Sequence, residues 1–250
     1  MAAKEPSDVP APPWRKSRRP APPKRQLSQE LIVETGLRIL DDEGFDALSM
    51  RRVAQELDTG PASLYAHVSG KEELLELIYD RVLSEIHLPQ RPDPARWKEQ
   101  LREYSLEVHR VFREHADVAR AALANIPTGE NSLRAGEFTY GLLVEAGMPP
   151  AEASLAMDRL SLYLVGDAYE GSLHRARMRA AGMSSPEEYF QAFVGQISAY
   201  YRALPAERFP HLQAHVADLT AGDGEDRFAY GLELMLDGIE ARMPKKPVRP

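Results

Sequence analysis

The stretch DTGPASLYAHVSGK, residues 58–71, carries side chains that can bind phosphates and base edges. The hydroxyls of Ser63 and Tyr65 can hydrogen-bond to phosphate oxygens or bases, and small alanines let a helix approach a groove closely. Lys71 stands at the expected start of the next helix, where its charge and the free backbone N–H groups both favour a phosphate. The stretch therefore predicts a surface that contacts DNA.

The spacing of the same stretch is typical of a helix-turn-helix. Residues 58–60 form a polar turn, and Pro61 suits the first position of a helix, where its missing N–H costs nothing. Leu64 and Val68 lie four residues apart and can anchor this third helix on the first two. Their expected partners are Ile39, Val53 and Leu57. The outward side chains are then Ala62, Ser63, Ala66 and His67, with Tyr65 at the edge. In this geometry the later helix lies in the major groove.

Three of these residues have alternative roles. Arg51 can pair with Glu56 or Asp46, as surface arginines commonly do. His67 can cap the end of its short helix, and Tyr65 can pack its ring on the following helix. These roles are compatible with DNA binding, because residues that position a helix often also contact the phosphate backbone.

A second set of candidates lies in the long helical part that follows, where aromatic and polar residues mix. Small-molecule sites are mostly apolar with a few polar anchors. The candidates are Tyr104, His109, Phe112, Phe138, Tyr140, Met157, Tyr163, Asp167, Tyr169 and His174. Asp167 either faces solvent or awaits a partner, which could be a ligand cation, Arg159 or Arg175. Ordinary core packing is the alternative for most of this set.

Catalytic and metal-binding signals are weak. His211 and His215 have the i, i+4 spacing of metal ligands, but Asp218 is the only acidic residue within the helix expected at 209–219. The chain has no glycine-rich phosphate loop, nucleophile elbow or HExxH motif. We therefore expect no enzyme, no metal site and no cofactor.

The composition is that of a globular protein, with 43% hydrophobic and 28% charged residues among 250. The absence of cysteine excludes disulfides and thiolate metal sites and favours a reducing compartment. No apolar run is long enough to span a bilayer, and residues 1–26 lack the apolar core of a secretory signal. We expect a cytoplasmic protein without a membrane partner.

Charge is unevenly distributed along the chain, whose net charge is −7. Residues 1–27 hold seven basic and two acidic residues, whereas the rest is acidic. Such a basic arm either contacts phosphates or is a solvated disordered tail. Its segment Trp14–Arg19 lies close enough to the first helix to reach an adjacent minor groove.

Helical periodicity predicts an all-α fold. After a disordered, basic, Pro-rich arm at 1–27, a helix begins at the N-cap Ser28 and stops at Gly44. Helices at 50–57, 61–68 and 71–87 follow, with Ser49 capping the second and a capping box at 69–72 starting the fourth. The proline-rich segment LPQRPDP, residues 88–94, then ends the helical pattern. Later helices are expected at 95–115, 116–125, 131–146, 150–180, 186–203, 209–219 and 225–242. The expected domains are 28–87 and 94–243, with a tail at 244–250.

About 55 residues, from LSQELIVETG to KEELLELIYD, resemble the N-terminal domain of the TetR family of bacterial transcriptional regulators. The resemblance lies in R-x-V-A-x-x-L at Arg51–Leu57 and in P-x-S-L-Y-x-H-V-x-x-K-E-x-L-L at Pro61–Leu75. It implies that Ser49 and Arg51 bind phosphates, with Arg51 also within reach of a base. It further implies groove contacts from Gly60, Pro61, Ala62 and Ser63, and backbone contacts from Tyr65, His67 and Lys71.

The sequence departs from the family pattern at two positions. Asp58 replaces a common turn glycine, and aspartate tolerates the left-handed conformation that such a turn needs. Its negative charge could weaken binding to DNA. Ala66 replaces a larger side chain and removes one possible base contact.

The resemblance also implies a C-terminal domain that binds an effector and forms a homodimer. FAYGLELMLDGIEARM, residues 228–243, is similar to the family's last helix. Its apolar stripe is Phe228, Leu232, Met235, Leu236 and Ile239, with Gly231 and Gly238. A second stripe is Leu155, Leu160, Leu162, Tyr163, Val165 and Tyr169. Two such helices from each chain would form a four-helix interface, and burial within one monomer is the alternative.

These features together predict a homodimeric, ligand-responsive regulator, most simply a repressor. An effector in the C-terminal domain would release it from a near-palindromic operator, with movement of the helix at 71–87 linking the two domains as is usual in the family. An activator and a constitutive DNA-binding protein are the alternatives.

Overall fold

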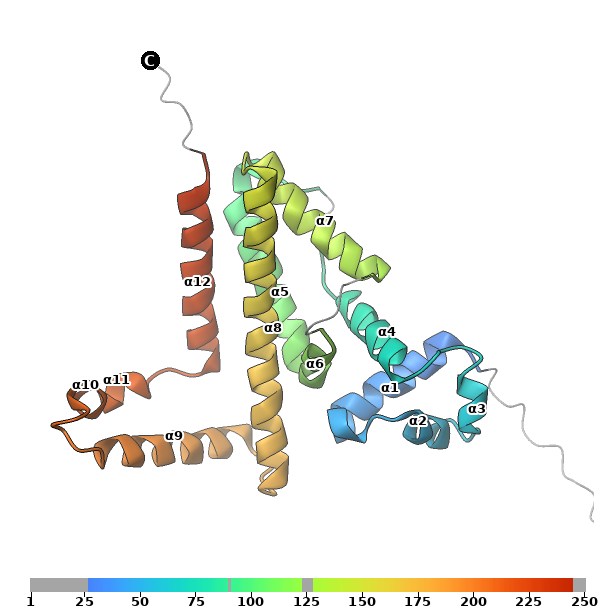
Figure 1. Ribbon diagram of the computed structural model, residues 1–250, viewed down its shortest axis with the longest axis horizontal. Helices are drawn as coiled ribbons and strands as arrows, with labels where there is room; N and C mark the ends of the chain where they lie inside the picture. Colours follow the sequence, from blue (N-terminus) through green and yellow to red (C-terminus); the bar gives the residue numbers. More distant parts are fainter. Residues whose placement is uncertain (1–26, 90, 123–127, 245–250) are drawn as a thin grey trace, which may run out of the picture.

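The structure, a computed structural model, describes residues 27–89, 91–122 and 128–244 (Figure 1). This part of the chain is helical and contains no strand, so the predicted all-α fold is confirmed. The first four helices are α1 (Gln29–Glu43), α2 (Met50–Glu56), α3 (Pro61–Leu64) and α4 (Lys71–Leu83). The remaining helices are α5 (Trp97–Glu114), α6 (Ala119–Ala122), α7 (Glu130–Glu145), α8 (Pro150–Ala180), α9 (Pro186–Arg202), α10 (Pro210–Ala214), α11 (Val216–Leu219) and α12 (Gly224–Arg242). Three short 3-10 helices are η1 (Phe45–Ala47), η2 (Pro94–Arg96) and η3 (Ala116–Val118).

The predicted caps start the first two helices. The Ser28 hydroxyl accepts a hydrogen bond from the Leu31 backbone N–H, and the Ser49 hydroxyl accepts one from the Arg52 backbone N–H at 3.1 Å. Gly44 ends α1 with φ at 90°, a conformation that suits glycine. Helices α1 and α2 thus begin, and α1 ends, where the sequence indicates.

Leu64 and Val68 anchor the third helix as expected, because both side chains are fully buried together with Val53 and Ile39. The turn before α3 contains Asp58 at φ 49°, so this aspartate adopts the expected left-handed conformation. Helices α1 to α4 therefore form the helix-turn-helix unit that the spacing predicts.

Several predicted boundaries are wrong. The third helix ends at Leu64 and continues only as turns, because a segment of four helical residues has few backbone hydrogen bonds to extend it. The fourth ends at Leu83, beyond which 3-10 hydrogen bonds replace the α-helical pattern. At its start the expected capping box is absent. Gly70 is the N-cap residue, and Glu73 rather than Glu72 accepts from the Ser69 backbone N–H.

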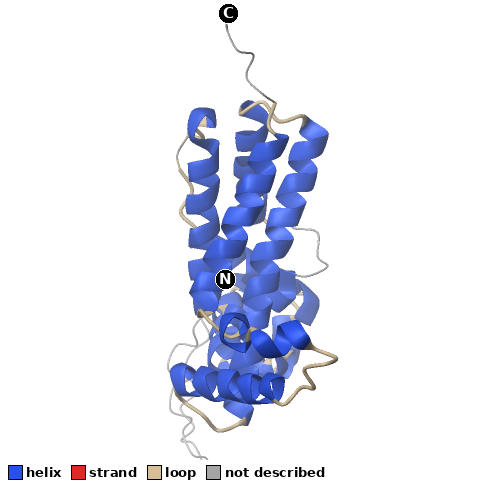
Figure 2. Cartoon of the chain, turned by 90° about the vertical axis from the view of Figure 1, so that its left-hand side faces the viewer, coloured by secondary structure: helices blue, strands red, loops and turns tan. Residues whose placement is uncertain are grey.

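The later helices form a bundle in which α5, α8 and α12 lie side by side (Figures 1 and 2). Ion pairs fasten α12 along α5. Lys98 binds Asp237 and Glu240, and Arg102 binds Glu233 through two guanidinium nitrogens. The pairs are partly exposed to solvent and set the register between the helices more than the stability of the bundle.

The stripe predicted for the last helix lies inside the monomer. Phe228, Leu232, Leu236 and Ile239 of α12 are buried against their own chain. Gly231 serves the same packing, because a Cβ at this position would collide with the hydroxyl of Tyr163 on α8. The apolar side chains left exposed on the α8 and α12 surface are Leu155, Leu162 and Leu173 of α8 and Tyr230 and Leu234 of α12. Of these, Leu155 and Leu162 belong to the second predicted stripe.

Helices α9, α10 and α11 extend away from the bundle at the C-terminal end of α8 (Figure 1). The helix expected at 209–219 is divided into α10 and α11 at His215. The helix expected at 116–125 is reduced to η3 and α6, and residues 123–125 lie outside the described part. Within the described residues, no helix is both long and apolar enough to cross a membrane.

Candidate DNA-binding surface and effector site

Helix α3, which we call the recognition helix, exposes one face and buries the other. Pro61, Ala62 and Ser63 are exposed, and 55% of the Tyr65 surface is accessible, so Tyr65 does not pack on α4. Leu64 between them is fully buried. Gly60 has open space around its α-carbon, which allows a phosphate backbone to approach the turn.

Adjacent arginines on α2 have different environments. Arg52 binds Glu43 at 2.6 Å and Glu56 at 2.8 Å. The side chain of Arg51 is exposed and pairs with no carboxylate in the described part of the chain. The alternative role suggested for Arg51 therefore falls to its neighbour, and Arg51 stays available for an anion.

The remaining DNA-contact candidates lie at the edges of this surface. Ser49 is exposed at the N-terminus of α2. The His67 backbone carbonyl accepts a hydrogen bond from Gln29 Nε2 at 3.1 Å, which ties the end of the recognition segment to α1. The Lys71 ammonium lies 5.0 Å from the centre of the Phe45 ring, a cation–π contact that competes with a phosphate.

Three of the predicted effector residues meet inside the bundle around Phe228. His109 on α5 stacks on the Phe228 ring at 3.7 Å, and its Nε2 lies 3.3 Å from Asp167 Oδ2. Tyr163 lies 5.5 Å from the same ring, and its hydroxyl donates to the Phe228 carbonyl at 2.7 Å. Burial and the Asp167 carboxylate raise the pKa of Tyr163. Neither Arg159 nor Arg175 pairs with Asp167; Arg159 binds Asp158.

A second aromatic cluster lies between α4, α5 and α7. Tyr104 contacts Phe138 at 5.8 Å, and Phe112 contacts Tyr79 at 6.2 Å between ring centres. Burial raises the pKa of Tyr79 to about 12 and raises that of Tyr104 further, so both hydroxyls stay protonated. Tyr79 was absent from the predicted set, although its place on the predicted linking helix was a signal for it.

The other predicted residues do not join either cluster. Tyr140 and Tyr169 are half-buried against the core, and Met157 is half-buried on α8. His174 lies in a separate cluster between α8 and α9, where its Nδ1 is 3.2 Å from the Tyr189 hydroxyl. Phe190 and Phe193 complete that cluster.

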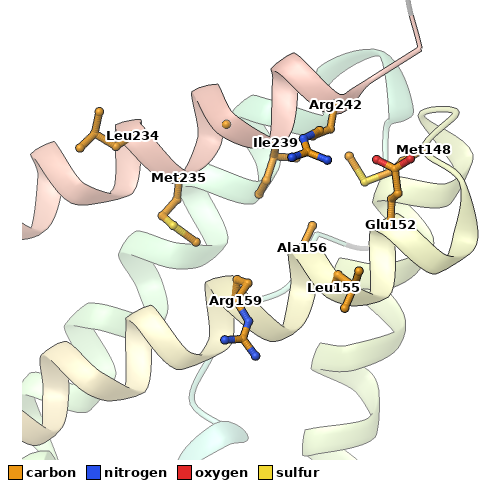
Figure 3. Close-up of a pocket in the computed structure, with 10 residues that line it drawn as sticks. Met148, Glu152, Leu155, Ala156, Arg159, Leu234, Met235, Ile239 and Arg242 are labelled. Carbon is orange, nitrogen blue, oxygen red and sulfur yellow. The ribbon is translucent and has the colours of Figure 1, made fainter.

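An open groove of about 350 Å³ lies between α8 and α12 (Figure 3). None of the predicted effector residues lines it. Met148 precedes α8, and Leu155 and Ala156 of α8 face Leu234, Met235 and Ile239 of α12, with charged residues at the rim. Leu155, Met235 and Ile239 of the groove belong to the apolar stripes that the sequence indicates, whereas Met148, Ala156 and Leu234 do not.

His115 is a polar junction between the first four helices and the bundle. Its Nδ1 lies 2.8 Å from Asp41 of α1, and its Nε2 lies 3.3 Å from Glu85, just beyond α4. Glu85, Glu114 and His115 also form the one group in the described residues whose spacing suits a metal ion. Sequence spacing missed this junction because its members are up to 74 residues apart. His211 and His215 do not form such a group; His215 faces Asp218 at 3.3 Å.

The exposed recognition helix on a three-helix unit, joined to a helical bundle with a polar aromatic interior, defines a helix-turn-helix regulator with a sensory domain. Comparisons with known proteins agree. The family described as "Bacterial regulatory proteins, tetR family" matches residues 32–78, and "Tetracyclin repressor-like, C-terminal domain" matches residues 88–243. The chain therefore belongs to the tetR family of DNA-binding transcriptional regulators.

Individual relatives cover nearly the whole chain. It is 31% identical to the HTH-type transcriptional repressor DrrR1 of Streptomyces coeruleorubidus over 93% of this chain and 85% of that protein. An HTH-type transcriptional regulator of Saccharopolyspora erythraea is 32% identical over 91% of each. The Streptomyces coelicolor protein ActR, solved in complex with actinorhodin, is 40% identical with a TM-score of 0.75, covering 88% of this chain and 98% of that one.

Proposed function

We propose that the protein is a repressor that binds a near-palindromic operator as a homodimer and is released by a small aromatic effector. The observation that carries the DNA-binding surface is the recognition helix itself. Ser63 and Tyr65 are exposed on a helix that Leu64 and Val68 hold in place. Arg51 lies unpaired on the preceding helix, and together they offer hydroxyls and a guanidinium to the major groove.

The proposed domains follow the order of the chain. Residues 28–87 bind DNA, and residues 94–243 bind the effector and form the dimer. Residues 1–27 act as a basic arm, and 244–250 are a tail; residues 1–26 and 245–250 lie outside the described part. A chromosomal operator places the protein in the cytoplasm, and its work is binding rather than catalysis.

The face shared by α8 and α12 is our proposed dimer interface. Leu155, Leu162, Tyr230 and Leu234 are exposed there beside the apolar groove. Exposed apolar patches of this kind are typical of protein interfaces. A two-fold axis would place α8 and α12 of each subunit against those of the partner. This arrangement keeps the predicted helices and two of the predicted side chains, Leu155 and Leu162, and adds Tyr230 and Leu234.

For the effector site, we propose the cluster of His109, Tyr163 and Asp167 around Phe228. His109 and Asp167 form a polar pair that faces aromatic rings within the bundle, which is how small-molecule sites combine an apolar wall with polar anchors. An aromatic ligand with hydrogen-bonding groups could stack in place of the His109 and Phe228 contact and engage Asp167. The solved complex of ActR with actinorhodin supports a small-molecule effector for a protein of this fold.

The test begins with selection of bound duplexes from a random-sequence pool by the purified protein. We expect a near-palindromic sequence that wild type binds more tightly than random duplex, and a weaker complex for Tyr65→Ala across a salt series. Selection of no sequence, or unchanged binding by Tyr65→Ala, would contradict the proposed recognition surface.

Release is then measured by adding actinorhodin, with minocycline as a second probe, to the selected complex. A probe that binds must dissociate wild type from DNA and must act more weakly on Asp167→Asn, because the carboxylate anchor is lost. Tight probe binding without release would show that the site does not control DNA affinity. Release that is unchanged in Asp167→Asn would place the effector elsewhere.

A further inference from the structure

Helix α7 starts without a capping side chain of its own. Its N-cap residue is Gly129, which offers no side-chain acceptor. The first turn of a helix leaves backbone N–H groups without intrahelical partners, and these groups need an acceptor from elsewhere.

Helix α4 supplies that acceptor through Asp80. One carboxylate oxygen accepts from the Ser132 backbone N–H at 2.9 Å and from the Ser132 hydroxyl at 3.0 Å. The other accepts from Asn131 Nδ2 at 3.0 Å, and the Asp80 backbone carbonyl accepts from the same amide at 3.2 Å. The positive end of the α7 dipole adds to these bonds. We call this set of contacts the α4–α7 cap.

The cap tolerates little displacement. A Cβ at Gly129 would collide with the Asp80 side chain, so the helices are as close as a glycine allows. Ser132 is buried beneath the contact. Since hydrogen bonds weaken steeply beyond about 3.5 Å, a small shift of α4 along α7 would break several bonds together.

Residues near Asp80 bind α4 to α1 within the DNA-binding unit. Arg81 donates to Glu34 of α1 at 2.5 Å. Gly36 of α1 lies against Ile78, where a Cβ would stand 2.7 Å from the Ile78 Cδ1 atom. Helices α1 and α4 therefore move together, and a bond that fixes Asp80 also fixes the helices that α1 supports.

Further along, α7 reaches the aromatic cluster of the bundle. Phe138 is buried two turns beyond the cap and contacts Tyr104 of α5. Tyr79, the neighbour of Asp80, contacts Phe112 in the same region. The cap thus lies where the bundle interior, α7 and the DNA-binding unit meet.

We propose that Asp80 is a positioning residue that sets the spacing between the two recognition helices of the dimer by capping α7 from α4. This inference rests on the proposed dimeric operator binding. In this proposal the Asp80 carboxylate determines the angle between the DNA-binding unit and the bundle. It predicts that loss of the cap changes binding to two half-sites at once and leaves binding to one half-site intact.

The test compares wild type, Asp80→Ala and Asp80→Asn on the selected palindrome, on palindromes with altered half-site spacing, and on a duplex with a single half-site. We expect Asp80→Ala to lower palindrome affinity by about tenfold, a common size for coupling between sites, and to broaden the spacing preference. Half-site affinity should remain that of wild type. Asp80→Asn keeps the side-chain volume and should give the same pattern if Asp80→Ala folds poorly.

Two further variants act as controls. Glu76→Ala removes an exposed carboxylate from the same helix and should bind both duplexes as wild type does. Asn131→Ala removes a donor on the α7 side of the cap and should lower palindrome affinity while leaving half-site affinity unchanged. A loss confined to the palindrome in variants on both helices would be a result that a general loss of stability cannot give.

Opposite outcomes would overturn the inference. If palindrome and half-site affinities fall together, or if neither falls, Asp80 only stabilises α7. If wild type selects no DNA sequence at all, the proposed function fails and the inference fails with it. Specific binding by wild type with an unchanged spacing preference in Asp80→Ala would leave the proposed function standing and remove this role of Asp80.

Discussion

Two neighbouring arginines on α2 have different roles: Arg52 makes ion pairs within the protein, and Arg51 is available to bind an external anion. Arg52 holds the helix to the end of α1 through Glu43 and to its own helix through Glu56. Those carboxylates raise the pKa of Arg52, so its charge is held in place by internal partners. Arg51 has no such partner and keeps its donors for an external anion.

Alanine substitution should separate these tasks. We expect Arg51→Ala to reduce the slope of log affinity against log salt by about one, because one phosphate contact is lost. Its thermal unfolding midpoint should equal that of wild type. Arg52→Ala is the matched variant and should lower the midpoint with a smaller change in salt slope. Binding isotherms at several salt concentrations and thermal scans measure both, and the reverse pattern would exclude Arg51 as the phosphate ligand.

His115 links stability to pH at the junction between the DNA-binding unit and the bundle. Hydrogen bonding to Asp41 raises the pKa of His115, with Glu85 adding to the effect, although partial burial acts against it. Only the imidazolium can donate to both carboxylates at once.

Other groups around the His115 ring also affect its charge. The C-terminal end of α5 favours the cation, and Glu114 lies close to the ring. Arg175 and Arg179 of α8 and Asp117 of η3 are the other charges near this junction.

The sign of the pH effect follows from the raised pKa. The stabilisation should be fully present below the unfolded value of about 6.5 and should disappear as pH rises through the higher folded pKa. Wild type should therefore exceed His115→Gln in unfolding midpoint at low pH, with a gap that narrows as pH rises. His215→Gln, at an exposed histidine beside Asp218, is the control. A gap independent of pH, or one that persists only with zinc and vanishes with a chelator, would contradict proton control.

At the scale of the element, α3 depends on tertiary contacts for its existence. Four helical residues cannot sustain a helix in water, since nucleation is unfavourable. Pro61 fixes the first turn, and Leu64 and Val68 bury the inner face. The recognition surface is therefore as stable as the small core beneath it.

Leu64→Ala should cost about 2–5 kcal/mol in the free energy of unfolding, because it opens a cavity under α3. DNA binding should fall with it, as α3 loses its position. Tyr65→Ala alters the adjacent, exposed residue and should weaken DNA binding with an unchanged free energy of unfolding. Denaturant titration gives the first quantity and duplex titration the second. An unchanged stability for Leu64→Ala would mean that α3 is held by other contacts.

At the scale of the whole molecule, the two long helices α8 and α12 are bound to each other on one side and leave apolar residues on the other. Their inner stripe is used within the monomer, so the proposed dimer must use Leu155, Leu162, Tyr230 and Leu234. The projecting helices α9 to α11 add further exposed apolar residues beyond this face.

Leu162→Asp should place an unpaired charge in the proposed interface and raise the dimer dissociation constant by about tenfold or more. Leu106→Asp is a matched control, because Leu106 is also 46% exposed but lies on α5, outside the proposed α8 and α12 interface. Sedimentation velocity across a concentration series measures the dimer. A monomeric wild type, or a dimer weakened equally by both variants, would contradict this interface.

The local sequence determined the helix-turn-helix. Helix starts and stops depend on residues only a few positions away: Ser28, Ser49 and Pro61 start helices, and Gly44 ends one. Leu64 and Val68 bury the face that their spacing indicates. The helix ends at Leu64 and Leu83 were not predictable to the residue, since hydrogen bonds that switch from α to 3-10 geometry leave the apolar spacing unchanged.

Only the tertiary structure decided which distant groups meet. His109, Asp167 and Phe228 form one polar aromatic site, and His115 finds Asp41 and Glu85, because helix packing fixes rotations that periodicity leaves open. For the same reason the stripe on α12 faces its own monomer. An apolar stripe requires burial, and nothing in the stripe itself says whether the covering surface comes from the same chain.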